Sequence, residues 1–373
     1  MLTCLVAGLA SGQELLEQGR ASYLKGEYAR SAELLGKALT DCEQDAVCKE
    51  NPYEILKALS RTMGVMGRLA EAEEFLQRAI EVRESRGETG AELADDLTEW
   101  AMLCRKQKKY ERGLERLHRV MSLQHRKAYD SLEGHAALAD TFSRMALFHV
   151  DQEQPDLAAN ALGMAVEFRK RVHGENHVAL LPELDRLGTV LIAKQRYEDG
   201  ERVFRHSLRI KEQSMGLSEA DLISSLDGLG YVLFGQKKYA EAEPVYLRLL
   251  SVWKDSVGKE HPMVSMILDK LALFYREQEG RQEGEAASAE ANSIRALFFA
   301  TGLRREAGVL RGRGDREGAA KLYKDALQVL SVDRAEHAEL KTQLENHLRQ
   351  MRVAERPSPK KSVKGVAAKK AEE

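Results

Sequence analysis

Two histidines in one short connection come nearest to a metal site in type and spacing. His173 and His177 bound the sequence HGENH, and imidazole nitrogens are common zinc ligands. No third ligand stands at a supporting spacing, and His261 occupies a connection of the same form, VGKEHP. This recurrence instead predicts loop histidines that pack at the start of the next helix. We expect no metal site.

Signatures of catalysis are also absent from the sequence. It has no glycine-rich loop to cradle a phosphate, no nucleophile elbow and no zinc-protease helix motif. We therefore expect a protein that is not an enzyme and has no cofactor. The formal net charge of −2 gives no general affinity for nucleic acid. No apolar run reaches the roughly 18 residues that a transmembrane segment needs.

Cysteine chemistry is the second kind that the sequence could support. Cys42 and Cys48 lie in the loop TDCEQDAVCKENP, and their separation permits a small disulfide loop. In an oxidising compartment this pair predicts a disulfide, whereas in the cytosol it would be two exposed thiols. Cys104 stands at a core position of the helical pattern described below, so we expect it to be a buried apolar residue.

The N-terminus bears on the same question of compartment. An apolar run from Leu2 to Ala10 is followed by small residues, and Ala10 and Gly12 are placed as before a signal-peptidase cut at Gln13. The basic residues that normally open a leader are missing, and the alternative is a frayed apolar end or part of an extra helix. We expect residues 1–12 to be the remnant of a signal segment and the protein to be periplasmic or secreted, with the cytoplasm as the alternative.

The elements that position all these residues are helical hairpins. The stretch from Leu226 to Leu250 shows the pattern: an amphipathic helix A, a short polar turn, and a helix B that begins at Tyr239. Gly230 in helix A and Ala242 in helix B are small, which lets the two backbones approach each other. One hairpin cannot bury both of its apolar faces alone.

This hairpin is repeated along the chain. Its small helix A residue recurs at steps of 41, 41, 45, 42, 42 and 42 residues, and an eighth copy follows at 35. A period of this length predicts an all-α solenoid in which each hairpin packs against its neighbours. The small residues are Gly19, Ser60, Ala101, Ala146, Gly188, Gly230, Ala272 and Ala307, and the residues that open helix B are Tyr28, Leu69, Tyr110, Pro155, Tyr197, Tyr239 and Arg281.

At these residues the chain resembles the tetratricopeptide repeat family. The family's alternation of small and bulky positions is matched by Gly230, Leu233, Ala242 and Tyr246, while Leu249 is larger than usual. The 42-residue spacing is similar to that of the repeats of kinesin light chain and its bacterial relatives. The resemblance implies a right-handed superhelical solenoid of antiparallel helix pairs, and it implies function only in outline.

The array is predicted to cover residues 13–330 with about eight hairpins. Residues 331–353 then predict a charged capping helix with Leu340, Leu344, Leu348 and Met351 along one face. The Lys-rich segment 354–373 has little to bury and is predicted to be disordered.

The resemblance also implies a binding surface. In this family helix A lines the concave groove with the residues three before, one after and four after its small residue. This rule predicts a ligand with basic or amide-donor groups, held by carboxylates beside apolar anchors; the alternative is that the carboxylates are solvated helix residues. The groove residues so predicted are Asp185, Asp227 and Asp269 with Ile192, Tyr231, Phe234 and Leu273.

The function that follows is a non-catalytic scaffold that binds a peptide or protein segment in its groove. Two alternatives remain open: a structural subunit of a cell-envelope complex, and a regulatory array for a separate enzyme or signalling partner. The sequence does not give the partner's identity or the oligomeric state.

Overall fold

The computed structural model describes the backbone of residues 2–44, 52–128, 131–278, 281–330 and 334–354. Side chains are described for these residues except 2–12, 125–128, 281 and 352–354. Within these ranges the chain is helical and has no strand, and it divides into two units, Met1–Leu217 and Ser218–Glu373, here called unit 1 and unit 2. No helix in the described part is long and apolar enough to cross a membrane.

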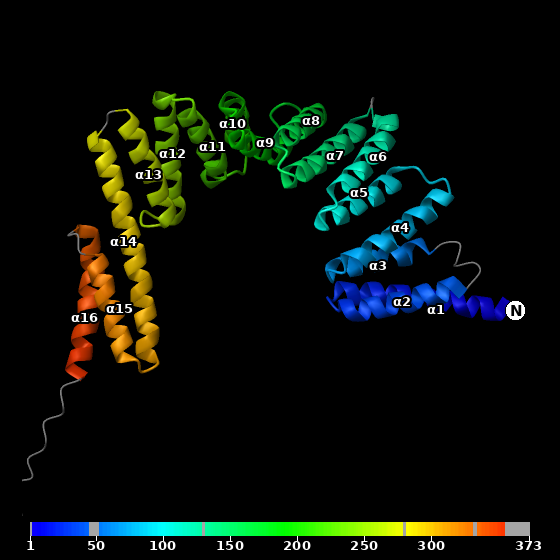
Figure 1. Cartoon of the computed structure of the whole chain (residues 1–373), viewed down its shortest axis with the longest axis horizontal. Helices are drawn as coiled ribbons and strands as arrows, with labels where there is room; N and C mark the ends of the chain where they lie inside the picture. The colour runs from blue at the N-terminus through cyan, green and yellow to red at the C-terminus, as the bar shows by residue number, and fades with distance from the viewer. Residues whose placement is uncertain (1, 45–51, 129–130, 279–280, 331–333, 355–373) are drawn as a thin grey trace, which may run out of the picture. The chain divides into compact units, whose positions relative to one another are not determined.

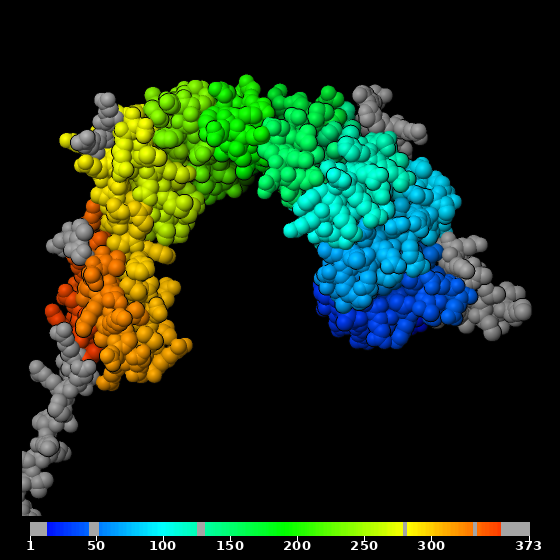
Figure 2. Space-filling view, viewed as in Figure 1, coloured from blue at the N-terminus to red at the C-terminus, as the bar shows by residue number. Residues whose placement is uncertain are grey.

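Unit 1 is a series of antiparallel helix pairs (Figure 1). Each pair packs on the next along the chain, as the space-filling view shows (Figure 2). The pairs are α1 (Leu2–Leu24) with α2 (Tyr28–Gln44), α3 (Tyr53–Val65) with α4 (Leu69–Ser85), α5 (Ala91–Lys106) with α6 (Tyr110–Ala128), α7 (Leu132–Asp151) with α8 (Pro155–His173), and α9 (Leu181–Ala193) with α10 (Tyr197–Gln213); the 3-10 turn η2 (Val178–Leu180) precedes α9.

Unit 2 continues the pattern and then departs from it. Its helices are α11 (Ile223–Gly235), α12 (Tyr239–Val257), α13 (Pro262–Glu277), α14 (Arg281–Gly312), α15 (Arg316–Val329) and α16 (Ala338–Ala354), with 3-10 turns η3 (Glu219–Leu222) and η4 (Ala335–His337). The predicted cap residues Leu340, Leu344 and Met351 of α16 are buried in one apolar cluster with Tyr323 of α15. The predicted tail 354–373 lies outside the described residues except for the backbone of Ala354, which ends α16.

The small helix A residues explain why the pairs can form. A Cβ atom on Gly188 would lie 2.5 Å from the ring of Phe204 on helix B, and one on Gly230 would lie 2.9 Å from the ring of Tyr246. An aromatic ring therefore occupies the space that a side chain would need. The predicted alternation of small and bulky positions is this contact, repeated in both units.

The turn between helix A and helix B has the same conformation throughout the described pairs. The residue two before the start of helix B has a positive φ, whether it is glycine, as Gly67 (φ 77°), or not, as Lys237 (φ 60°). Backbone bonds hold the turn, since Lys238 N donates to Leu233 O at 2.9 Å and Lys237 N donates to Phe234 O at 2.9 Å. This is the αL helix end that such bonds stabilise.

The seventh and eighth predicted hairpins share one helix. α14 runs for 32 residues and contains both helix B of the seventh copy and helix A of the eighth. No proline or turn dipeptide separates the two in the sequence, so no connecting loop forms. The missing loop accounts for the shorter step of 35 residues. The small residues of the eighth copy, Ala307, Ala319 and Ala326, are fully buried.

Candidate functional site

The carboxylate predicted to face a groove in unit 1 is held by its own helix pair. Asp185 on α9 accepts hydrogen bonds from Ser207 Oγ at 2.9 Å and Lys211 Nζ at 3.3 Å, both on α10. Lys211 is only 6% exposed. Ile192, predicted beside this aspartate, is half-buried. The structure thus gives Asp185 an internal partner.

The carboxylates predicted in unit 2 are paired as well, but at the surface. Asp227 on α11 pairs with Lys270 on α13, and Asp269 on α13 pairs with Arg295 on α14. Both aspartate side chains remain nearly half exposed, at 45% and 46%.

The apolar residues predicted beside these aspartates differ in exposure. Tyr231 and Leu273 stand one turn after Asp227 and Asp269 and are 44% and 48% exposed. Phe234 is half-buried, and its ring centroid lies 5.5 Å from that of Tyr239. Unit 2 therefore presents two copies of one surface pattern, a paired carboxylate followed by an exposed apolar side chain.

One position of helix B supplies the cation in most of these pairs. The fifteenth residue of the helix is Arg83 in α4, Arg169 in α8, Lys211 in α10 and Arg295 in α14. Each contacts a carboxylate on a helix A. In α12 the same position is Trp253, so Asp227 is paired by Lys270 of the next helix A instead. The sequence contained this spacing, but the groove rule considers helix A alone.

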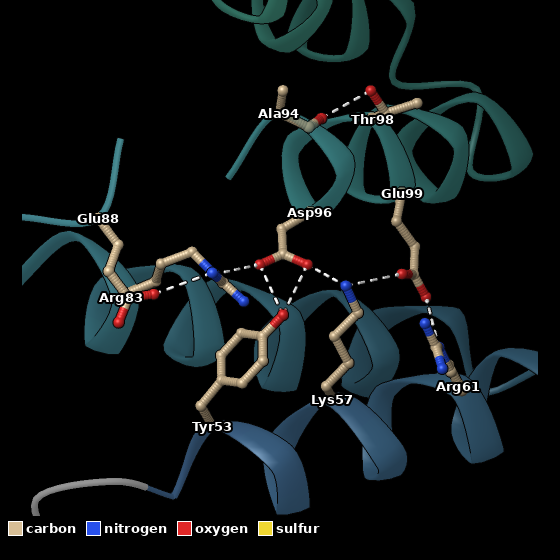
Figure 3. A network of polar contacts seen from close by, with 9 residues as sticks. All are labelled: Tyr53, Lys57, Arg61, Arg83, Glu88, Ala94, Asp96, Thr98 and Glu99. Atoms are coloured by element: carbon tan, nitrogen blue, oxygen red, sulfur yellow. Dashed lines mark hydrogen bonds and ion pairs between the residues drawn. The ribbon is translucent and has the colours of Figure 1, made fainter. Parts of the chain in front are cut away.

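The most enclosed of these contacts joins α3, α4 and α5 (Figure 3). Asp96 on α5 is 0% exposed. It accepts hydrogen bonds from Tyr53 Oη at 2.9 Å, from Arg83 Nε at 3.0 Å and from Lys57. The guanidinium of Arg83 also lies over the ring of Tyr53, 4.2 Å from its centroid.

Two members of this network, here called the Asp96 cluster, have pKa values shifted further from neutral pH. Burial lowers the pKa of Lys57, but the hydrogen bond and charge of Asp96 outweigh it, so that the pKa is raised. Burial raises the pKa of Tyr53. The ammonium stays charged and the phenol stays neutral, so neither is suited to act as a general base. The cluster joins two hairpins by charge and hydrogen bonding.

A second buried carboxylate joins the same two hairpins at the other end of the helices. Glu73 on α4 is 5% exposed. It accepts from Trp100 Nε1 at 3.1 Å, Gln107 Nε2 at 2.9 Å and Lys109 Nζ at 2.7 Å, and Arg112 Nη1 lies 3.0 Å away. Cys104 beside it is fully buried, and burial raises the pKa of its thiol to about 11. Cys104 is therefore the buried core residue that its position predicted.

Two adjoining pockets open on the helix A face of α1, α3 and α5. One, of about 290 Å³, is lined by Arg20, Tyr23, Lys57 and Arg61. The other, of about 210 Å³, shares Tyr23 and Arg61 and adds residues of α5. We call the two together the α1–α3–α5 groove; its other lining side chains include Glu54, Glu99, Met102 and Lys106.

The groove rule finds these residues when it is applied to the first hairpins. Arg20 and Tyr23 stand one and four after the small residue Gly19, and Arg61 stands one after Ser60. Sequence reasoning missed them because it followed the recurrence of aspartate three before the small residue. At that position α3 has Lys57, which turns inward to Asp96.

The histidines and cysteines singled out in the sequence have structural contacts. His177 Nδ1 accepts from Ala179 N at 3.2 Å, and His261 Nδ1 accepts from Met263 N at 3.2 Å, so both cap the start of the next helix. Nowhere in the described ranges do three His, Cys, Asp or Glu side chains gather as metal ligands. Cys42 is buried and disulfide-bonded. Cys48 lies outside the described residues, so the predicted pairing stays a prediction.

Comparison with known proteins identifies the repeat. Residues 138–179 and 222–262 match the family model of the tetratricopeptide repeat. The C-terminal part of a repeat-containing protein from Cytophaga hutchinsonii is 12% identical, with a TM-score of 0.54 over 75% of this chain and 95% of that one. BtubC (BKLC) from P. vanneervenii is 16% identical, with a TM-score of 0.46 over 67% of this chain and 91% of that one.

A putative kinesin light chain from Podosopora anserina is 17% identical, with a TM-score of 0.45 over 54% of this chain and 94% of that one. Comparison with curated proteins gives no match. The family match falls on the α7–α8 and α11–α12 hairpins, one in each unit. The chain therefore contains tetratricopeptide repeats, which the family model matches at residues 138–179 and 222–262.

Proposed function

We propose that this protein is a scaffold that binds an extended segment of a partner protein along helix A of its repeats. Tetratricopeptide repeats serve generally in protein–protein interaction, and their fold is typically non-catalytic. The observation that supports this site in particular is the α1–α3–α5 groove, whose two pockets are joined by Tyr23 and Arg61. Adjoining pockets suit successive side chains of one bound segment.

The lining of the groove favours a segment that combines apolar and acidic side chains. Four cations and the carboxylates of Glu54 and Glu99 line the groove. Arg20 pairs with Glu54, and Lys57 pairs with the buried Asp96. Arg61 and Lys106 are therefore the cations best placed to meet an acidic ligand. Tyr23 and Met102 offer apolar surface between them. Asp185, Asp227 and Asp269 are already engaged by cations, so the expected preference for a basic partner has less support than a preference for an acidic one.

Arg61 is the side chain best placed to test the proposal. It is 58% exposed, and its one ion pair among the described residues is with Glu99 at 3.6 Å. Arg61→Glu should therefore leave the fold intact while reversing charge in both pockets. Binders are selected from a displayed library of random peptides against the full chain, and their affinities are measured by fluorescence anisotropy.

Selected peptides should be enriched in Asp or Glu beside apolar residues. Arg61→Glu should lower their affinity about tenfold or more. Arg30→Glu, a charge reversal on the exposed face of α2, serves as the matched control and should leave affinity unchanged, because Arg30 is 71% exposed and lines none of the described pockets. Equal binding to the wild type and Arg61→Glu would reject the groove as the site.

A further inference from the structure

A separate pocket lies between two successive helices B of unit 1. It has a volume of about 330 Å³ and opens between α8 and α10, with α9 as its floor. Each helix contributes side chains at helical spacing, so that one stripe of each faces the same space. None of its lining residues belongs to the α1–α3–α5 groove. The volume is within the range of about 300–1,000 Å³ typical of ligand sites.

The floor of this pocket is apolar and closely packed. Leu184, Leu187 and Leu191 follow one another along one side of α9, and Leu184 and Leu191 are 2% and 3% exposed. Gly163 on α8 forms part of the wall, and a Cβ atom added there would meet nothing within 4 Å. The absence of a side chain at Gly163 thus leaves the space open.

On one side of the rim of the pocket, two cations share one carboxylate. Asp199 is shared by two guanidiniums, since Arg196 Nε donates to it at 2.8 Å and Arg202 also pairs with it. On α8, Lys170 pairs with Glu167 of the same helix at 3.1 Å and with Glu175 at 3.3 Å. Three cations and two carboxylates line the pocket, and Glu175 stands beside Lys170 as a third carboxylate.

The imidazole of His206 also lies at this rim. His206 lines the pocket beside Arg202, and its Nε2 lies 2.8 Å from the carbonyl oxygen of Glu175. One carboxylate between two arginines leaves a guanidinium able to take a further anion, as arginine forks do readily.

We propose that the α8–α9–α10 pocket binds a small amphipathic anion, an organic acid whose apolar body lies on the α9 leucines and whose carboxylate meets Arg196 and Arg202. The leucine floor buries the apolar body, and the shared carboxylate of Asp199 holds both guanidiniums at the rim. The site is separate from the groove of the proposed function, and binding here does not depend on that function.

Decanoate is the probe, titrated into the full chain below its micellar concentration and followed by isothermal titration calorimetry. Decanol and decyltrimethylammonium share its chain but lack the negative charge. Decanoate should bind at least about tenfold more tightly than either, because only it can pair with the rim. Equal binding of decyltrimethylammonium would show adsorption to apolar surface alone and would overturn the proposal.

Two variants locate the binding site. Gly163→Leu places a side chain in the open space and should abolish decanoate binding, while leucine is a better helix former than glycine. Gly36→Leu is the matched control, because Gly36 also lies within a helix with nothing near an added Cβ and lines none of the described pockets. It should bind decanoate as the wild type does.

Arg202→Ala keeps the test valid if Gly163→Leu perturbs folding. Arg202 is 78% exposed, so its truncation should preserve the fold. It should lower the affinity for decanoate about tenfold and make that affinity less dependent on salt. Decanoate binding that is unaffected by both Gly163→Leu and Arg202→Ala would reject this pocket.

Discussion

Asp96 in unit 1 and Asp269 in unit 2 are both paired with a cation from a helix B, but the two ion pairs lie in different environments. Each carboxylate pairs with the fifteenth residue of a helix B, Arg83 in one case and Arg295 in the other. Asp96 is 0% exposed, whereas the side chain of Asp269 is 46% exposed. The partner position is thus conserved in the repeat geometry, but the burial of the contact is not.

The difference comes from which residue of helix A receives the cation. Asp96 stands five before the small residue of its helix and belongs to the hairpin that follows Arg83. Asp269 stands three before the small residue and belongs to the same hairpin as Arg295. Two residues correspond to about 200° around a helix. The first contact therefore lies between two hairpins, and the second lies at the surface of one.

Glu183 shows that the buried arrangement recurs with a variation. It also stands five before its small residue, is 2% exposed, and lies 3.1 Å from Arg169 of the preceding helix B. It accepts a hydrogen bond from Ser143 Oγ at 2.9 Å, where Asp96 has the cation Lys57. The comparison predicts that the Asp96 cluster contributes most to joining hairpins, because both the carboxylate and its two cations are enclosed, whereas the cations on the buried Glu73 are 43% and 42% exposed.

Replacement of Asp96 should have the largest effect. Asp96→Asn keeps the shape of the side chain but removes the buried charge shared by Lys57 and Arg83, which are 13% and 10% exposed. The two cations then keep only the more exposed carboxylates of Glu99 and Glu88. We expect the free energy of unfolding of unit 1 to fall by about 3–5 kcal/mol. The measurement is urea unfolding followed by the fluorescence of Trp100 in a Trp253→Phe background, since the chain's two tryptophans fall one in each unit.

The matched control is Asp269→Asn followed through Trp253 in a Trp100→Phe background. A loss below about 1 kcal/mol for Asp96→Asn would break the comparison, because burial would then not decide the strength of the contact.

Protonation of Glu73 should have an intermediate effect and adds a pH dependence. Burial alone would raise the pKa of Glu73, but hydrogen bonds from Lys109, Trp100 and Gln107 and the charge of Arg112 hold it below its ordinary 4.5. A folded-state pKa below the unfolded value stabilises the protein at pH above the unfolded value. That contribution is lost as the pH falls from about 4.5 through the folded-state pKa.

Glu73→Gln should remove this contribution, of about 1–3 kcal/mol, and flatten the fall in stability of unit 1 as the pH drops below the ordinary carboxyl value of 4.5. Glu71→Gln on the same helix is the control, because Glu71 is 42% exposed and Arg68 is its one ion-pair partner in the described part of the chain. Parallel pH profiles for the wild type and Glu73→Gln would show that the carboxylate does not act as a buried anion.

The sequence predicted the helices well because the repeat contains two independent signals. The apolar period of each helix and the small residue of each contact agree, and the helices B begin at the predicted openers, including the weak ones Pro155 and Arg281. The error lay in α14, where two predicted helices are one. Only a few residues decide whether a helix continues or is broken by a short turn. The alanine-rich sequence near Ala291 is compatible with either outcome.

The candidate site was less predictable for a physical reason. Which helix A residues lie on the groove side follows from helical spacing, and that rule locates Tyr23 and Arg61 as well as Tyr231. Whether a carboxylate there is available depends on a long side chain from another helix, such as Lys211 or Arg295. The reach and rotamer of such a side chain are set by packing across the hairpin, which spacing along one helix does not contain.

The smallest effect is expected for Asp269, and it sharpens the comparison most directly. Asp269→Asn should lower the free energy of unfolding of unit 2 by about 0–1 kcal/mol. The side chains of Asp269 and Arg295 are both nearly half exposed, so water replaces the lost partner. The loss should shrink further at high salt, which screens exposed charges but hardly affects buried ones. Unfolding followed by Trp253 at low and high ionic strength measures both quantities. A salt-independent loss above about 2 kcal/mol would mean that Asp269 is enclosed like Asp96, and the surface pattern of Asp227, Tyr231, Asp269 and Leu273 would then be part of the core of unit 2 rather than a face open to a partner.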